Sequence, residues 1–372
     1  MKKIGREVLF LKTRKGNPRN GEGAFIRLLN GQIMYAYTEY YGESRHDHAV
    51  ARISAVYSSD EGETWSERKV LMEKDEDALN IMSVSLIRCD NGDLGLLYLR
   101  KFMNGNRLLC MPYFVRSADD GRSFTDPVCC FSDEGYYVVN NDRVVRLKSG
   151  RIIFPLAYHG TSGEMLTPGT LTVCYSDDDG KSFCLMKSFV RSPYNDKVQL
   201  QEPGLYELSD GRLWMFCRTA YGHQYQCFSI DGGESFGEIT PALRFTSPDS
   251  PMQVKAAHGY TVAVFNPFGY SCARDACECW GSPQRTPFVL AYSDDGGISF
   301  VDAQAMPAGG GFRCFSEKCR FLEDDVENSY CYPAIIEVSD GFLVAYYHSD
   351  NTNVCLNAAK ITKVSLDELS NG

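Results

Sequence analysis

The chain alternates short apolar runs with polar turns, and one unit of this pattern recurs six times. Each unit is an apolar stretch, a tight turn with a glycine, and a second apolar stretch. Leu213, Met215 and Cys217 show the every-second-residue alternation that is typical of a strand. Asparagine–glycine or aspartate–glycine pairs at four of the turns favour hairpins, because glycine accepts the positive φ that such turns need. The units span residues 26–34, 86–96, 144–154, 206–216, 335–345 and, in a weaker form, 254–265.

A second repeat, an octet with the pattern Ser-x-Asp-x-Gly-x-Ser/Thr-aromatic, is interleaved with the hairpins. Its aspartate can accept hydrogen bonds from backbone N–H groups further along the turn. Its glycine supplies a positive φ, and its aromatic ring returns the chain to the core. These residue types indicate a turn held together by its own side chains, so we assign the octet a structural role and not a catalytic one. The five copies lie at residues 58–65, 117–124, 176–183, 229–236 and 293–300.

Repeats of this kind, built from strands and turns, are typical of β-propellers, which grow by adding one small sheet at a time. Six hairpins and five octets predict an all-β fold, a six-bladed β-propeller, in which the sixth octet is lost or shared where the ring closes. No linker, low-complexity tract or long helical pattern interrupts the chain. Residues 1–372 are therefore predicted to form a single domain.

Equivalent positions in the six hairpins predict which side chains meet, because the inner strands of a propeller surround a central channel. We take the position nine residues before each turn glycine. Folding one hairpin at Asp210 also brings Arg218 to the height of Glu202, because each lies eight residues from the turn. Glu202, Arg218 and Tyr332 are therefore expected to be neighbours. The five ring positions are Glu22, Ser83, Asn141, Glu202 and Tyr332.

A tyrosine beside a carboxylate and an arginine can act as a nucleophile. The phenol has an unperturbed pKa of about 10, and an adjacent carboxylate can take its proton as the oxygen attacks. The alternative interpretation is structural. Glu202 and Arg218 can form a cross-strand ion pair, and Tyr332 can be an aromatic residue of the channel wall. Spacing alone leaves both interpretations open.

The octets resemble the Asp boxes, or BNR repeats, of the sialidase (neuraminidase) family of β-propellers, and the resemblance covers nearly the whole chain. In that family a glutamate assists a tyrosine nucleophile, an aspartate is the acid/base, and three arginines bind the substrate carboxylate. A neutral phenol suits an anomeric carbon that carries its own carboxylate, and arginine forks suit planar carboxylates. The resemblance implies an exo-acting retaining glycoside hydrolase that releases a terminal sialic acid or a related acidic sugar.

Several segments of the chain resemble motif segments of that family. The hairpin with Glu202 and Arg218 is similar to that of the assisting glutamate and the second arginine. Arg285-Thr286-Pro287 is similar to the third-arginine segment. Tyr330-Cys331-Tyr332-Pro333 is similar to the nucleophile segment, and the distance to the turn glycine favours Tyr332 over Tyr330. The loop at Asp47 is similar to the mobile acid/base loop. The resemblance therefore implies that Tyr332, Glu202 and Asp47 are catalytic, and that Arg218 and Arg285 hold the substrate carboxylate.

One motif of the family is missing. Sialidases carry the first arginine in an Arg-Ile-Pro segment that enters the first blade, whereas the ring position here is Glu22. Arg19 or Arg143 could complete a clamp of three arginines. The candidate substrate-binding residues therefore also include Arg19, Glu22, Asn141 and Arg143.

Three hypotheses follow from these residues. The protein is a glycosidase of the sialidase type, an exo-glycosidase of the same fold that uses Glu22 and Asp47 on another sugar, or a non-catalytic carbohydrate-binding propeller. The last is disfavoured because a pure binder does not need a phenol–carboxylate couple.

Composition narrows the class of partner. The net charge of −10 argues against nucleic acid, because phosphate binding needs a basic face. No apolar run has the length of a membrane span. The first fifteen residues hold only a short apolar patch, which predicts a cytoplasmic protein. Fifteen cysteines then indicate reduced thiols, and Cys272, Cys277 and Cys279 lack the paired spacing of a zinc site. We expect a carbohydrate partner and no metal, cofactor, nucleic acid or membrane.

Overall fold

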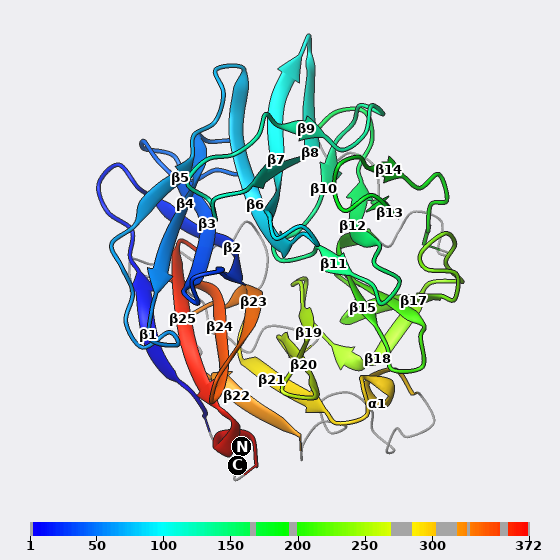
Figure 1. Cartoon of the computed structure of the whole chain (residues 1–372). Coiled ribbons are helices and arrows are strands. Elements are labelled where there is room, and N and C mark those ends of the chain that lie inside the picture. Colours follow the sequence, from blue (N-terminus) through cyan, green and yellow to red (C-terminus); the bar gives the residue numbers. More distant parts are fainter. Residues whose placement is uncertain are drawn as a thin grey trace.

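The computed structural model describes residues 3–163, 169–192, 199–268, 285–302, 318–325, 328–349 and 356–370. Within them the strands form six antiparallel sheets, which are arranged as the blades of a β-propeller around a common centre (Figure 1). The all-β class and the six blades are thereby confirmed. The strands follow the chain around the ring, so the colours of Figure 1 run once around it from blue to red.

The blades are numbered here in chain order. Blade one consists of β2 (Arg19–Arg27), β3 (Ile33–Tyr40), β4 (Ala51–Ser58) and β5 (Lys69–Met72), and blade two of β6 (Ala78–Arg88), β7 (Leu94–Asn104), β8 (Arg107–Ser117) and β9 (Val128–Cys129). Blade three consists of β10 (Tyr137–Val138), β11 (Val145–Arg146), β12 (Ile152–Tyr158), β13 (Thr170–Ser176) and β14 (Cys184–Leu185). Blade four consists of β15 (Gln201–Glu207), β16 (Leu213–Arg218), β17 (His223–Ser229) and β18 (Thr240–Thr246).

Blade five consists of β19 (Gln253–Ala257), β20 (Tyr260–Phe265), β21 (Phe288–Ser293) and β22 (Cys319–Glu323), and blade six of β23 (Cys331–Val338), β24 (Gly341–His348), β25 (Ala358–Ser365) and β1 (Arg6–Leu11). Two short helices, α1 (Ile298–Val301) and α2 (Leu366–Ser370), complete the elements of the described part. No helix among the described residues is long and apolar enough to cross a membrane.

Ring closure explains why the chain has five octets and six blades. The fourth, outermost strand of blade six is β1, which pairs with β25 through Arg6 and Lys363. In the other blades the octet forms the turn between the third and fourth strands. In blade six these two strands come from opposite ends of the described chain, so no turn connects them. Of the two predicted outcomes, a sixth octet lost or one shared at ring closure, the described strands show the loss.

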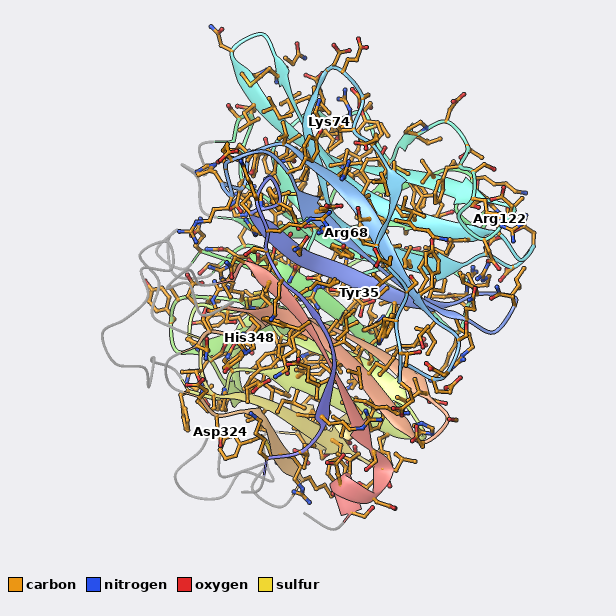
Figure 2. All side chains as sticks on the ribbon, turned by 90° about the vertical axis from the view of Figure 1, so that its left-hand side faces the viewer. Tyr35, Arg68, Lys74, Arg122, Asp324 and His348 are labelled. Carbon is orange, nitrogen blue, oxygen red and sulfur yellow. The ribbon has the colours of Figure 1, made fainter. Side chains whose placement is uncertain are left out.

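The core lies between neighbouring blades. Apolar side chains from facing sheets interdigitate there, for example Ile26 and Met34 of blade one with Leu86 and Leu96 of blade two. Figure 2 shows the ring from its side, with the buried Tyr35 inside and the exposed Arg122 at the periphery. Each blade thus buries both faces and leaves its inner strand to line the channel.

The octets are held together as their residue types predict. In the fourth copy, Ser229 Oγ accepts a hydrogen bond from the Gly233 N–H at 2.8 Å, and Asp231 Oδ1 accepts one from the Ser235 N–H at 3.0 Å. Burial opposes ionisation of Asp231, but the hydrogen bonds from Ser229 and Ser235 outweigh it and lower the pKa to about 2. Equivalent bonds are present at Asp60, Asp119, Asp178 and Asp295. The octets lie at the turns between outer strands, which fits their structural role.

We expect Asp231→Ala to lower the melting temperature by a few degrees, because this turn loses its acceptor. Comparable capping bonds contribute about 1 kcal/mol. The folded-state pKa lies below the unfolded one, so the stabilisation is present above about pH 4 and is lost as the pH falls through about 2. Thermal melts at pH 7 and in acid measure both effects. Glu238→Ala, an exposed carboxylate just beyond the octet, is the control, and an equal loss in both variants would contradict the prediction.

Candidate active site

Irregularities in four inner strands turn the ring residues towards the channel. In blades one, two, four and six the register of the inner hairpin shifts at a bulge, and a residue in each bulge has a positive φ. A left-handed conformation costs a non-glycine residue on the order of 1–2 kcal/mol, and strain of this kind clusters at functional sites. The residues are Glu22 (53°), Ser83 (58°), Glu202 (45°) and Tyr332 (57°). All four line one cavity, so the ring register predicted from the glycine spacing is confirmed for them.

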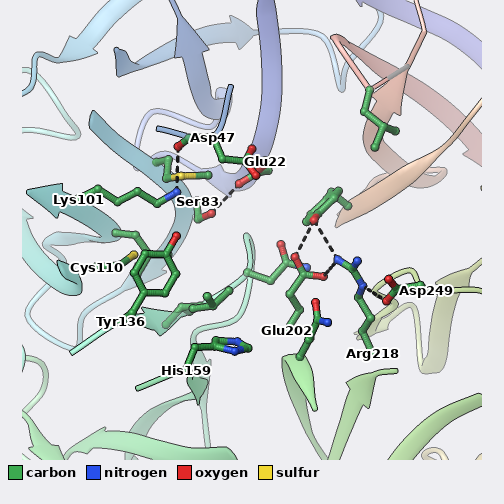
Figure 3. Close-up of a pocket in the computed structure, with 18 of the residues that line it drawn as sticks. Glu22, Asp47, Ser83, Lys101, Cys110, Tyr136, His159, Glu202, Arg218 and Asp249 are labelled. Carbon is green, nitrogen blue, oxygen red and sulfur yellow. Dashed lines mark hydrogen bonds and ion pairs between the residues drawn. The ribbon is translucent and has the colours of Figure 1, made fainter. Parts of the chain in front are cut away.

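This cavity has a volume of about 340 Å³ and is lined by residues of several blades (Figure 3). The volume lies near the lower end of the range for small-molecule sites. Cations and carboxylates are equally numerous in its described lining, so their formal charges cancel. Figure 3 shows Glu202, Arg218 and Asp249 on one side, and Glu22, Asp47 and Lys101 on the other. The charged lining residues are Arg19, Lys101, Arg218, Arg285, Glu22, Asp47, Glu202 and Asp249.

Tyr332 and Glu202 form a hydrogen-bonded phenol–carboxylate couple at the wall of the cavity. The Tyr332 hydroxyl donates to Glu202 Oε1 at 2.6 Å, and Arg218 Nη1 donates to Glu202 Oε2 at 2.8 Å. The same Nη1 lies 3.5 Å from the Tyr332 oxygen. Burial and the Glu202 charge raise the pKa of Tyr332 well above its ordinary value. The phenol therefore keeps its proton at rest, with a carboxylate in position to take it.

Arg218 is oriented by two carboxylates. Besides its bond to Glu202, its Nε donates to Asp249 Oδ1 at 2.5 Å, from the loop between β18 and β19. Its Nη2 has no hydrogen-bond partner among the described residues. This geometry fixes the guanidinium plane and leaves one of its edges to a ligand.

Arg285 lies just before β21 of blade five and approaches the couple of Tyr332 and Glu202. Its guanidinium carbon lies 5.6 Å from the centre of the Tyr332 ring, and its Nη1 donates to Cys331 Sγ at 3.1 Å. Its side chain is buried, and its Nε has no partner within the described part of the chain. The two arginines predicted from the resemblance therefore reach the same cavity as Tyr332 and Glu202.

Arg19 is occupied by neighbouring protein groups. Its Nη2 donates to Glu22 Oε1 at 2.7 Å, its Nη1 donates to Asp47 Oδ1, and its Nε donates to the Tyr347 hydroxyl at 2.8 Å. The Ser83 hydroxyl donates to Glu22 Oε2 at 2.7 Å. All three nitrogens of Arg19 are thus committed inside the protein. Glu22 and Asp47 share this one guanidinium.

The environment shifts the pKa values of Glu22 and Asp47 in opposite directions. Burial raises the pKa of Glu22, and the negative charge of Asp47 raises it further. Arg19 lowers it, but by less. Burial would also raise the pKa of Asp47, but Arg19 and Lys101 hold it well below its ordinary value. Glu22 therefore keeps a proton to higher pH than Asp47 does.

Asn141 and Arg143 correct the prediction for blade three. Its inner strand is interrupted between β10 and β11, and the positive φ falls on Asp142 (59°), one residue after the predicted ring position. Asn141 Nδ2 donates to the Gly23 carbonyl at 2.8 Å, and Arg143 Nη1 donates to Gln253 Oε1 at 2.8 Å. Both side chains are buried and neither lines the cavity. Counting along the chain failed here because the strand is not continuous.

The remaining candidates are placed as follows. Tyr330 is buried in the core cluster of blades five and six, away from the cavity lining. Cys272, Cys277 and Cys279 lie outside the described residues. No group of three or more histidine, cysteine, aspartate or glutamate side chains in the described part of the chain is arranged to hold a metal ion.

Lys101 and Asp249 line the cavity and were not predicted from the sequence. Lys101 lies nine residues after Gly92, as Ser83 lies nine before it. The count that leads from Glu202 to Arg218 leads, when that hairpin is folded at Asn91, from Ser83 to Leu99, and Lys101 lies two residues further along β7. Asp249 lies in an irregular loop, and no spacing rule points to it.

Comparisons with known proteins agree with this fold. A protein of unknown function from Dyadobacter fermentans is similar in structure, with a TM-score of 0.71 and 18% identity over 96% of this chain and 99% of that one. The NanB sialidase of Streptococcus pneumoniae gives 0.68 and 13%, over 98% and 71%. The Trypanosoma rangeli sialidase, solved with 2,3-difluorosialic acid as a covalent intermediate, gives 0.69 and 14%, over 99% and 60%. These likenesses show a shared fold, and this chain spans about three fifths of the trypanosomal protein.

No curated protein matches the sequence. The family of BNR repeat-like domains matches residues 31–345, which include all six turn glycines and all five octets. This match agrees with the sialidase-like Asp-box propeller that the repeats predicted. The chain therefore belongs to the family of BNR repeat-like domains.

Proposed function

We propose that this protein is an exo-acting retaining glycoside hydrolase of the sialidase type. The observation that carries the proposal is the couple of Tyr332 and Glu202, joined at 2.6 Å beside the guanidinium groups of Arg218 and Arg285. A phenol that donates to a buried carboxylate is arranged to become a nucleophile only as its proton leaves. Structural relatives with the same fold are sialidases, which supports the same reaction class.

The proposed reaction has two steps. First, Tyr332 Oη attacks the anomeric carbon, its proton passes to Glu202 Oε1, and the leaving oxygen takes a proton from Asp47. The product is a glycosyl–tyrosine. Second, a water molecule gives a proton to Asp47 and attacks the same carbon, and the phenol oxygen leaves and recovers its proton from Glu202. The configuration of the anomeric carbon is retained because it is inverted twice.

Two arginines hold the substrate carboxylate in this proposal. Arg285 and the free edge of Arg218 present N–H donors beside Tyr332, and arginine forks bind carboxylates in a bidentate way. Arg19 does not join them, because Glu22, Asp47 and Tyr347 occupy its nitrogens. The clamp proposed here therefore has two members.

Turnover of a fluorogenic aryl sialoside tests the proposal, alongside a panel of other aryl glycosides. We expect release of sialic acid, and a glycosyl adduct on the peptide that contains Tyr332 when the protein is incubated with 2,3-difluorosialic acid. Turnover of no glycoside, with sugar binding retained, would instead identify a carbohydrate-binding propeller.

A second candidate is supported by Glu22. Its carboxylate occupies the ring position where sialidases carry an arginine, and it lines the cavity. An exo-glycosidase for another acidic or neutral sugar would use Glu22 and Asp47 as its working carboxylates. Turnover confined to a non-sialoside in the same panel favours this candidate.

We expect kcat/KM for the sialoside to fall as the pH rises from about 4 to 8. The acid acts only in its protonated form, and Arg19 and Lys101 keep the pKa of Asp47 low against the effect of burial. Asp47→Asn should abolish this fall when the leaving group is an activated phenol. An unchanged fall in Asp47→Asn would assign the proton to Glu22, whose pKa burial raises.

A further inference from the structure

The loop that carries Asp47 connects β3 to β4 in blade one, but its attachments come largely from blade two. Lys101 Nζ on β7 donates to the Asp47 carbonyl at 2.9 Å, and Asn80 Nδ2 on β6 donates to the same carbonyl at 2.9 Å. Asn80 Nδ2 also donates to the Ala49 carbonyl at 2.8 Å. Two side chains of the neighbouring blade thus hold the loop by its backbone, and Figure 3 shows one of them, Lys101, reaching Asp47.

Both donors are rigidly placed. Lys101 and Asn80 have exposed fractions of 4% and 0%. They lie on paired positions of the β6–β7 hairpin, so they approach the loop together. The Lys101 ammonium also lies 5.9 Å from the centre of the Tyr136 ring, which favours a cation–π contact. A buried lysine that bonds a backbone carbonyl is a demanding arrangement, because its charge has been removed from water.

On the side-chain end, the same loop is held by Arg19. Its Nη1 donates to Asp47 Oδ1 and to the Arg45 carbonyl, the latter at 3.3 Å. Arg19 is itself oriented by Glu22 and Tyr347. Arg19 therefore sets the direction of the carboxylate, while Lys101 and Asn80 fix the height of the backbone that carries it.

We propose that Lys101 and Asn80 are positioning residues that latch the Asp47 loop onto blade two and so hold the proton donor at the leaving-group side of the cavity. The inference rests on the proposed function for the role of Asp47, but the latch itself is a property of the fold. It assigns to a lysine of the second blade a part in placing a carboxyl group of the first. The Lys101 charge supports the same assignment, since it acts with Arg19 to lower the pKa of Asp47 against burial.

The latch is tested first without any substrate. Hydrogen–deuterium exchange is measured on residues 42–50 of the full chain and of Lys101→Met, which keeps the length of the side chain and removes its donors. We expect exchange of this segment to rise on the order of tenfold, with no rise in the β15–β16 hairpin. Lys101→Arg, which keeps charge and donors, should restore protection. Unchanged exchange in Lys101→Met overturns the proposal.

Lys363→Met is the matched control. Lys363 is also a buried lysine, with an exposed fraction of 6%, and it bonds Glu63 Oε1 at 2.8 Å, far from the cavity. It separates a local effect on the loop from the general cost of removing a buried ammonium. A comparable rise at residues 42–50 in Lys363→Met would show that the loop reports global destabilisation, and the latch would be rejected.

The catalytic arm compares two leaving groups. A loop that positions the acid matters for a poor leaving group such as the lactose of a sialyl-lactose, and matters little for a nitrophenolate. We expect Lys101→Met to lower kcat on the order of 10- to 100-fold for the first and less than about twofold for the second, with KM nearly unchanged. Equal losses on both substrates would assign Lys101 a merely structural role. If no glycoside is turned over, the exchange result still decides the latch, and only the proposed function fails.

Discussion

Tyr332→Phe is expected to lower kcat on the sialoside by on the order of 10³-fold or more, as removal of a nucleophile does in other enzymes. Phenylalanine fills the same space and keeps the ring contact with Arg285, but it has no oxygen to attack the anomeric carbon. The ion pair of Glu202 and Arg218 stays intact at 2.8 Å, so the cavity keeps its shape. Steady-state kinetics measure the loss, and mass spectrometry of the fluorosugar adduct checks that it comes from the covalent step.

Tyr330→Phe is the matched control for that variant. Tyr330 lies two residues earlier in the same segment and packs in the core, with its ring 6.3 Å from that of Phe288. Its hydroxyl does not face the cavity, so we expect kcat to remain within about twofold of the parent protein. A large loss in Tyr330→Phe together with a small loss in Tyr332→Phe would move the nucleophile to the other tyrosine. A large loss in both would point to the segment rather than to either oxygen.

Arg285→Gln is expected to weaken binding of the unsaturated sialic acid analogue by on the order of 10- to 100-fold. Hydrogen bonds to charged groups contribute about 1.5–3 kcal/mol, and each 1.4 kcal/mol corresponds to about tenfold in affinity. Among the described residues the Arg285 side chain bonds only the Cys331 sulfur. Its removal therefore leaves no carboxylate unpaired, and the melting temperature should change little. Isothermal titration and thermal melts measure the two effects separately.

Two other arginines serve as contrasting controls for this binding test. Arg218→Gln leaves the buried carboxylate of Glu202 and the half-buried one of Asp249 without their guanidinium partner, so it should lose both affinity and about 3–5 kcal/mol of stability. Arg143→Gln removes bonds to Gln253 and Met252 outside the cavity, so it should lose stability and keep affinity. If Arg285→Gln binds as the parent does while Arg143→Gln does not, the carboxylate site lies elsewhere.

Much of the site could be predicted from the sequence because each repeat has a turn glycine from which equivalent positions can be counted. The glycine of each hairpin fixes the height of its strands, so nine residues back leads to Glu22, Ser83, Glu202 and Tyr332, all in the cavity wall. The rule failed at Asn141, because a two-part inner strand shifts the left-handed residue to Asp142. It did not reach Asp249, which enters from a loop without a repeat.

The sequence by itself determined the blades, the octet turns and the meeting of Tyr332, Glu202 and Arg218. Strand periodicity and turn chemistry are local, and a closed ring leaves few ways to arrange equal repeats. Only the tertiary structure decided how the charges pair. Arg19 is held by Glu22, Asp47 and Tyr347, and Lys101 holds a loop of another blade. Such pairing depends on side-chain distances between blades, and electrostatic energies change steeply with distance and burial. A spacing rule along the chain therefore cannot predict which charges pair.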